Sequence, residues 1–111
     1  MDNLSRFKNK ILGRKYELSF AYLSDSEIKK LNKTYRKKNE PTDILSFPLT
    51  KWSGEVVVSL QQVKKKARLF GKNPKDYLNY LLIHGLLHLQ GRRHGKIMTT
   101  LEKKWVKFFK V

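Results

Sequence analysis

All three histidines of this 111-residue chain lie in one short segment, HGLLHLQGRRH, which spans residues 84–94. His84 and His88 are four residues apart, so a helix would project both imidazoles from one face, with Cβ atoms about 5–6 Å apart. Gly91 follows as a helix stop, because glycine readily takes the left-handed conformation that reverses a chain. The reversal can bring His94 back toward the same face. The segment therefore predicts a helix, a tight turn and a cluster of imidazoles at the helix end.

Three imidazoles at this spacing are typical of a transition-metal site. Imidazole nitrogens bind zinc at about 2.0–2.1 Å, and three histidines leave the fourth position of a tetrahedral ion open, as in catalytic zinc sites. We therefore predict one Zn²⁺ per chain, held by His84, His88 and His94 at the end of a central helix. Nickel or another divalent transition metal also suits these donors. Metzincin proteases share the spacing, but their glutamate base would stand where this chain has Gly85.

The rest of the chain alternates helical and strand patterns. Apolar spacing and capping residues predict helices at residues 4–12, 24–39, 59–70, 74–90 and 97–109, and strands at residues 16–23, 42–48 and 55–58. Ser24 and Glu27 have the spacing of a capping box, and Asn73 with Pro74 is a second helix start. Pro48 is expected to close its strand. We expect one α/β (α+β) domain over residues 1–111, with a small mixed sheet packed against helices.

The charge of the chain indicates its partner. Twenty-five lysines and arginines face nine acidic residues, which gives a formal charge of +16 and a pI near 10.2. A domain this basic favours nucleic acid. The candidate phosphate contacts are Arg36, Lys64, Lys65, Arg68, Arg92 and Arg93. The absence of cysteine excludes disulfides and thiolate metal sites. No apolar run approaches the roughly 20 residues that span a bilayer, and no signal segment opens the chain, so we expect a cytoplasmic protein without a membrane partner.

Five segments, in the same order, resemble those of YbeY-type endoribonucleases, the rRNA maturation factor family also described as UPF0054-like. They are LNKTYR at residues 31–36, TDILSFP at 42–48, GEVVVS at 54–59, the histidine segment at 84–94, and MTTLE at 98–102. The resemblance covers roughly residues 18–102. It implies a metal-dependent endoribonuclease that prefers single strands and acts in 16S rRNA 3′-end maturation and ribosome quality control. Single-stranded RNA, rRNA and the small ribosomal subunit are the implied partners; the oligomeric state stays open.

The resemblance also implies site residues. It implies a zinc-like ion at the three histidines and an RNA-contacting or catalytic role for Arg36. Glu55 is a second catalytic candidate that would orient a histidine or a water, although a surface acid on an edge strand fits it equally well. Asp43 and Ser46 would hold the loop near the metal, unless they only cap a local turn.

The chain departs from the family pattern beside the last histidine. Arg92 and Arg93 stand where family members carry Tyr-Asp, and an arginine cannot accept a hydrogen bond from a histidine ligand. This departure favours an alternative, a non-catalytic, metal-stabilised RNA-binding factor in ribosome assembly. A metal hydrolase acting on another substrate, such as peptide, is a third possibility.

Overall fold

Three strands form one mixed sheet in the computed structural model, which describes residues 2–93 and 95–111. Strand β1 is Glu17–Tyr22, β2 is Ile44–Thr50 and β3 is Ser53–Val58. The strand order is β1-β3-β2, with β1 parallel and β2 antiparallel to β3. The small mixed sheet expected from the sequence is confirmed.

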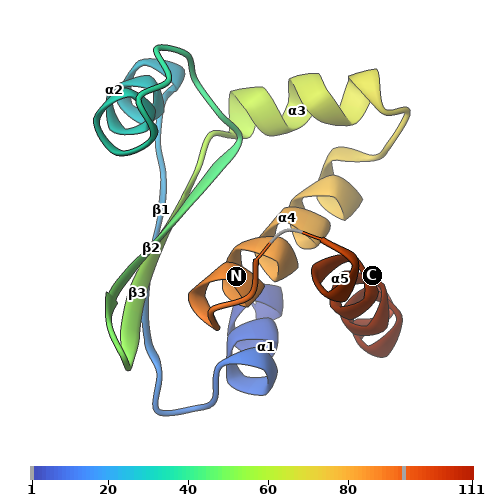
Figure 1. Ribbon diagram of the computed structural model, residues 1–111. Coiled ribbons are helices and arrows are strands. Elements are labelled where there is room, and N and C mark those ends of the chain that lie inside the picture. Colours follow the sequence, from blue (N-terminus) through green and yellow to red (C-terminus); the bar gives the residue numbers. More distant parts are fainter. Residues whose placement is uncertain (1, 94) are drawn as a thin grey trace.

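The described part of the chain also contains five helices. They are α1 (Asp2–Ile11), α2 (Asp25–Arg36), α3 (Leu60–Leu69), α4 (Pro74–Leu89) and α5 (Lys96–Phe109). Helix α2 lies on one side of the sheet, whereas α1 and α4 lie on the other (Figure 1). Helix α5 packs on α4, on the side away from the sheet (Figure 1). The fold is therefore α+β, with α4 at its centre.

The central strand β3 is buried on both faces. Val56 and Val58 join the main core between the sheet and α4, whereas Val57 belongs to a second cluster with Leu45 and Ile28 on the α2 side. Successive side chains of a strand point to opposite faces. A strand covered on both faces therefore needs an unbroken apolar run, which these three consecutive valines supply.

Helix α4 is the buried element that carries the histidines. Its leucines and isoleucine at positions 81, 82, 83, 86 and 87 are all buried, so apolar side chains surround the helix instead of forming one stripe. Asn73 caps the start, because its side-chain oxygen accepts a hydrogen bond from the backbone N–H of Lys75 at 2.8 Å. Gly91 follows the last turn at φ +97°, the left-handed conformation predicted for it.

Three local expectations were wrong. Strand β2 does not close at Pro48 but continues to Thr50, with an irregular register at that point. An edge strand tolerates the missing N–H of proline. Helix α2 ends at Arg36, before residues 37–39, because Lys37 takes a left-handed conformation at φ 56°. Glu55 lies on the central strand, so the alternative of an edge-strand acid is wrong as well.

Candidate metal and phosphate site

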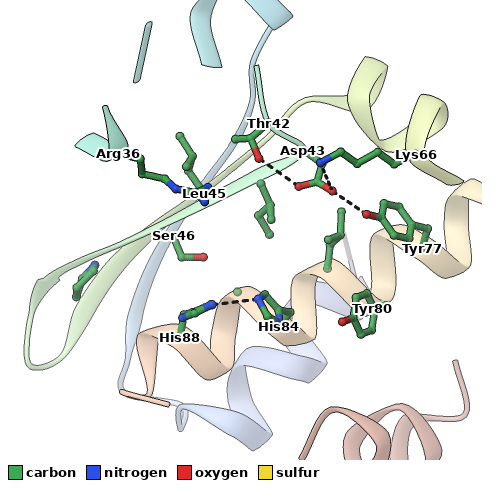
Figure 2. A pocket seen from close by; sticks show the side chains of 14 residues that line it. Arg36, Thr42, Asp43, Leu45, Ser46, Lys66, Tyr77, Tyr80, His84 and His88 are labelled. Carbon is green, nitrogen blue, oxygen red and sulfur yellow. Dashed lines mark hydrogen bonds and ion pairs between the residues drawn. The ribbon is translucent and has the colours of Figure 1, made fainter. Parts of the chain in front are cut away.

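A cleft of about 560 Å³ lies between β2 and α4. Helix α4 contributes His84 and His88, the end of α2 contributes Arg36, and α3 contributes Lys66. The other lining residues are Thr42, Asp43, Ile44, Leu45, Ser46, Pro48, Tyr77, Tyr80, Leu81 and Gly85. Figure 2 shows Arg36 and Lys66 on opposite sides of the cleft, with both histidines on α4. Segments far apart in the sequence thus bring cations and imidazoles to one cavity.

The two imidazoles face each other. The Nε2 atoms of His84 and His88 are 3.0 Å apart, and both side chains are partly buried. Two nitrogens that bind one tetrahedral zinc ion at about 2.0–2.1 Å lie roughly 3.3–3.4 Å apart. A small outward movement would therefore place one ion between the two nitrogens. The predicted i, i+4 pair fits a shared transition-metal ion.

The third predicted ligand, His94, lies outside the described residues. Within residues 2–93 and 95–111, no group of three or more histidine or acidic side chains is placed to hold a metal ion. The geometry on which the metal site is judged is therefore that of His84 and His88. Zinc itself, and the completion of the site by His94, stay predictions.

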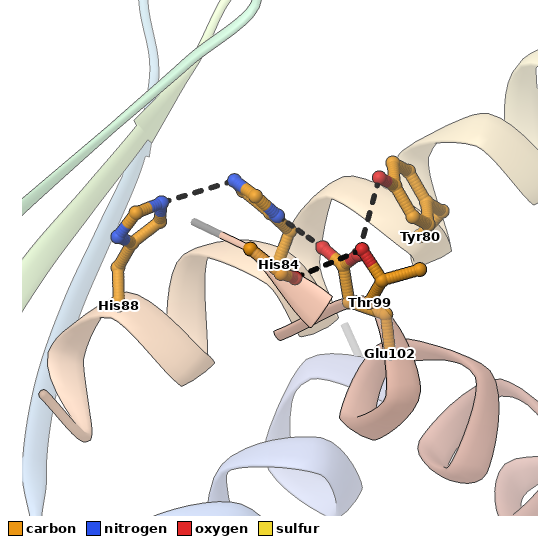
Figure 3. A network of polar contacts seen from close by, with 6 residues as sticks. Tyr80, His84, His88, Thr99 and Glu102 are labelled. Carbon is orange, nitrogen blue, oxygen red and sulfur yellow. Dashed lines mark hydrogen bonds and ion pairs between the residues drawn. The ribbon is translucent and has the colours of Figure 1, made fainter. Parts of the chain in front are cut away.

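The second nitrogen of His84 contacts a buried carboxylate. Its Nδ1 pairs with Oε2 of Glu102, which comes from α5 and is only 6% exposed (Figure 3). The hydroxyl of Tyr80 donates to the other carboxylate oxygen of Glu102 at 3.5 Å. Burial, followed by the nearby Glu102 charge, raises the pKa of Tyr80, so its hydroxyl remains a donor. The sequence marks Glu102 only by its place in the MTTLE segment, and no role was predicted for it.

Arg36 lies where the end of α2 meets the cleft. The left-handed Lys37 ends the helix directly after it. The ring of Tyr35 packs on that of Phe47 in β2, with centroids 4.8 Å apart, which fixes the last turn of α2 to the sheet. Arg36 is exposed and lines the same cavity as His84 and His88. The structure thus brings this predicted residue and the two histidines together.

Asp43 anchors the other end of the cleft. Its side chain is buried, and Oδ2 accepts a hydrogen bond from the hydroxyl of Tyr77 at 2.8 Å and lies 3.5 Å from Nζ of Lys66. Thr42 donates to Oδ1 at 3.4 Å. Burial and the hydrogen bond to Asp43 raise the pKa of Tyr77 well above its ordinary value, so it stays a donor. The sequence analysis named Asp43, but it identified neither Tyr77 nor Lys66 as its partner.

Glu55 does not line this cleft. Strand alternation puts it on the same face as Val57, toward α2 and away from the histidines. Its predicted catalytic role therefore lacks support from its position.

The remaining cationic candidates lie outside the cleft as well. Lys64, Lys65 and Arg68 are exposed on α3. Arg92 and Arg93 are exposed and line a separate pocket of about 310 Å³, together with residues 95–97. None of these five residues contributes to the lining of the cleft.

Comparison with known proteins decides the family. The chain matches the family model described as Endoribonuclease YbeY over residues 2–110. The chain belongs to the YbeY family. This confirms the resemblance seen in the sequence segments.

Several curated proteins that bear the name Endoribonuclease YbeY resemble this chain. One from Aquifex aeolicus is 43% identical over 72% of this chain and 57% of its own length. One from Halalkalibacterium halodurans is 35% identical over 71% and 60%, and one from Pelagibacter ubique is 37% identical over 81% and 64%. The chain thus spans about three fifths of the length of these YbeY relatives.

A solved structure has the same fold. The solution structure of TM1509 from Thermotoga maritima superposes with a TM-score of 0.69 at 32% identity, over 96% of this chain and 78% of that one. Among the residues described here, no helix is long and apolar enough to cross a bilayer.

Proposed function

We propose that this chain is a metal-dependent endoribonuclease that cleaves single-stranded RNA. The observation that carries the proposal is the cleft in which Arg36 shares one cavity with the facing imidazoles of His84 and His88. YbeY relatives that are 35–43% identical bear the name of an endoribonuclease. The formal charge of +16 suits a polyanionic substrate.

The basic side chains of the cleft each have a chemical task in this proposal. His84 and His88, with His94 as the predicted third ligand, would hold a zinc-like ion. Such an ion supplies a Lewis acid for a phosphate oxygen or lowers the pKa of a bound water. Arg36 binds phosphate oxygens through its planar fork and stabilises the charge that develops on them. Lys66, whose side chain is about one-third exposed, offers a second cation at the far end of the cleft.

The family resemblance suggests a more specific substrate. We extend the proposal to 16S rRNA 3′-end maturation and ribosome quality control, with the small ribosomal subunit as partner. Exposed cations on α3, together with Arg92 and Arg93, would contact phosphates along the strand without reading its sequence. A role on rRNA implies a cytoplasmic location.

Single-turnover cleavage of an unstructured RNA tests this function. The enzyme is assayed as purified, after chelation, and after Zn²⁺ is restored, and elemental analysis gives the metal content of each sample. We expect about one metal ion per chain, cleavage that chelation abolishes, and loss of most of the metal in His88→Ala. Full metal retention after all three histidines are replaced by alanine would contradict the metal site.

One observation favours a second function, a non-catalytic RNA-binding assembly factor. In the described part of the chain, Asp43, the carboxylate that lines the cleft, contacts Tyr77 and Lys66, and Glu102, which does not line the cleft, contacts His84. Neither is placed as an evident general base, and Arg93 cannot serve as one. RNA binding without metal-dependent cleavage, across several metals and RNAs, would support this second function.

A further inference from the structure

We propose that Glu102 is a positioning residue that fixes the tautomer of His84, so that the lone pair of Nε2 is available to the metal ion. This inference rests on the metal site of the proposed function and adds a residue to it. Glu102 lies 18 positions after His84 in the sequence and comes from a different helix, α5.

The burial of Glu102 is the first support. Glu102 is 6% exposed. It is one of the buried residues of α5, together with Met98 and Phe109. A buried carboxylate is costly unless other groups compensate it. Among the described residues, the side-chain partners of Glu102 are Nδ1 of His84 and the hydroxyl of Tyr80, which both belong to α4. The carboxylate is therefore directed at the imidazole and not at solvent.

The chemistry of imidazole is the second support. A neutral imidazole carries one N–H, and the hydrogen bond made by one ring nitrogen decides whether the other is free to bind a metal. A carboxylate beside Nδ1 keeps the proton there. The lone pair of His84 Nε2 then points toward Nε2 of His88, 3.0 Å away, where the two nitrogens would share an ion. Without an acceptor beside Nδ1, free histidine prefers to carry its proton on Nε2, which would block that position.

The two arginines of the loop after α4 cannot replace Glu102. Arg92 and Arg93 donate hydrogen bonds but accept none. Among the described residues, Glu102 is the carboxylate in contact with His84. The acceptor that Arg92 and Arg93 cannot provide is thus supplied by α5, and metal binding becomes coupled to the docking of α5 on α4.

Zn²⁺ affinity, measured by competition with a chromophoric chelator, is the first test. Removing such a partner typically weakens metal binding by about 10–100-fold. We expect Glu102→Gln to fall in this range, because its amide oxygen is a weaker acceptor, and Glu102→Leu to lose more. Glu40→Gln removes the same charge at an exposed position and should match the wild type. An affinity of Glu102→Gln within about twofold of the wild type would overturn the proposal.

The tautomer itself is the second test, and it needs no variant. Nitrogen–proton correlation spectra of the metal-free wild type at about pH 8, above the ordinary histidine pKa, report which nitrogen of His84 carries the proton. We expect Nδ1 in the wild type and a shift toward Nε2 in Glu102→Leu. A proton on Nε2 in the wild type would overturn the proposal even if both variants fail to fold. If the wild type binds no Zn²⁺, the proposed metal site fails, whereas the tautomer still decides the role of Glu102.

Discussion

Asp43 shows how single side chains hold the cleft together. Its carboxylate joins the segment directly before β2 to α4 through Tyr77 and to α3 through Lys66. A hydrogen bond to a charged group contributes about 1.5–3 kcal/mol, and a buried carboxylate that loses a donor stays desolvated. The Tyr77 hydroxyl is therefore a structural group of the cleft and not an exchangeable surface contact.

Tyr77→Phe should lower the free energy of unfolding by about 1.5–3 kcal/mol, because Asp43 loses the shortest of its side-chain hydrogen bonds. Urea denaturation at neutral pH measures the change. Tyr35→Phe is the matched control, since Tyr35 is 63% exposed and its loss of a hydroxyl should cost less than about 0.5 kcal/mol. Equal stability of the two variants would show that the bond to Asp43 contributes nothing.

Spacing along the chain predicted some site residues but not their partners. His84 and His88 were visible because a helix converts a separation of four into proximity, and Arg36 because it ends a recognisable segment. Glu102 and Tyr77 were not, since their contacts join residues 18 and 34 positions apart and depend on how helices pack. Glu55 was given a role from its segment alone, and the face of the sheet on which it lies emerged only from the fold.

At the scale of elements, Gly85 allows α4 to lie close to β2. A Cβ atom at this position would come within 2.7 Å of the Ser46 hydroxyl and 3.0 Å of Ile44 Cδ1. Glycine inside a helix ordinarily costs about 1 kcal/mol relative to alanine. Close packing of helix and strand along the cleft offsets that cost here. The same contact leaves no room for the glutamate that a metzincin protease carries at this position.

Gly85→Val should destabilise the fold by about 1–3 kcal/mol, because the extra carbon atoms press on β2 although valine is the better helix former. It should also weaken Zn²⁺ binding, since α4 carries both described histidines. Urea unfolding and chelator competition measure these effects, with Lys103→Val on an exposed position of α5 as control. A variant as stable as the wild type would contradict this expectation, because the packing cost against β2 would then be no larger than the gain in helix propensity.

The types of the helices and strands and several helix starts were predictable from the sequence, whereas the C-terminal ends of β2 and α2 were not. The helix starts at Ser24 and Asn73 follow from local capping, and the structure shows both. The passage of β2 through Pro48 depends on its place at the sheet edge, which no local pattern reveals. The end of α2 at Arg36 depends on a left-handed lysine, an uncommon conformation for that residue.

At the scale of the whole molecule, charge should govern RNA binding. Each phosphate contact with a single strand adds about −0.7 to the slope of log affinity against log salt. Replacing Lys64, Lys65 and Arg68 on α3 with glutamine should therefore make the slope shallower by about 2. The same number of glutamines at Lys103, Lys104 and Lys107 on α5 controls for the loss of net charge. Titrations of an unstructured RNA measure both slopes, and identical slopes would place RNA away from α3.

Arg36 provides the most direct test that the cleft is one catalytic site. Losing a contact that strengthens in the transition state costs on the order of 3 kcal/mol, or about a hundredfold in rate. Arg36→Lys should recover only part of this loss, because a point charge lacks the planar fork. Arg14→Ala removes an exposed arginine elsewhere and serves as control.

The decisive measurement is single-turnover RNA cleavage by Arg36→Ala at saturating enzyme, with metal content and thermal unfolding measured on the same samples. We expect a rate about a hundredfold below that of the wild type, with unchanged metal content and an unchanged unfolding transition. Cleavage by Arg36→Ala at the wild-type rate would contradict the assignment of Arg36 and the histidine pair, His84 and His88, to one active site.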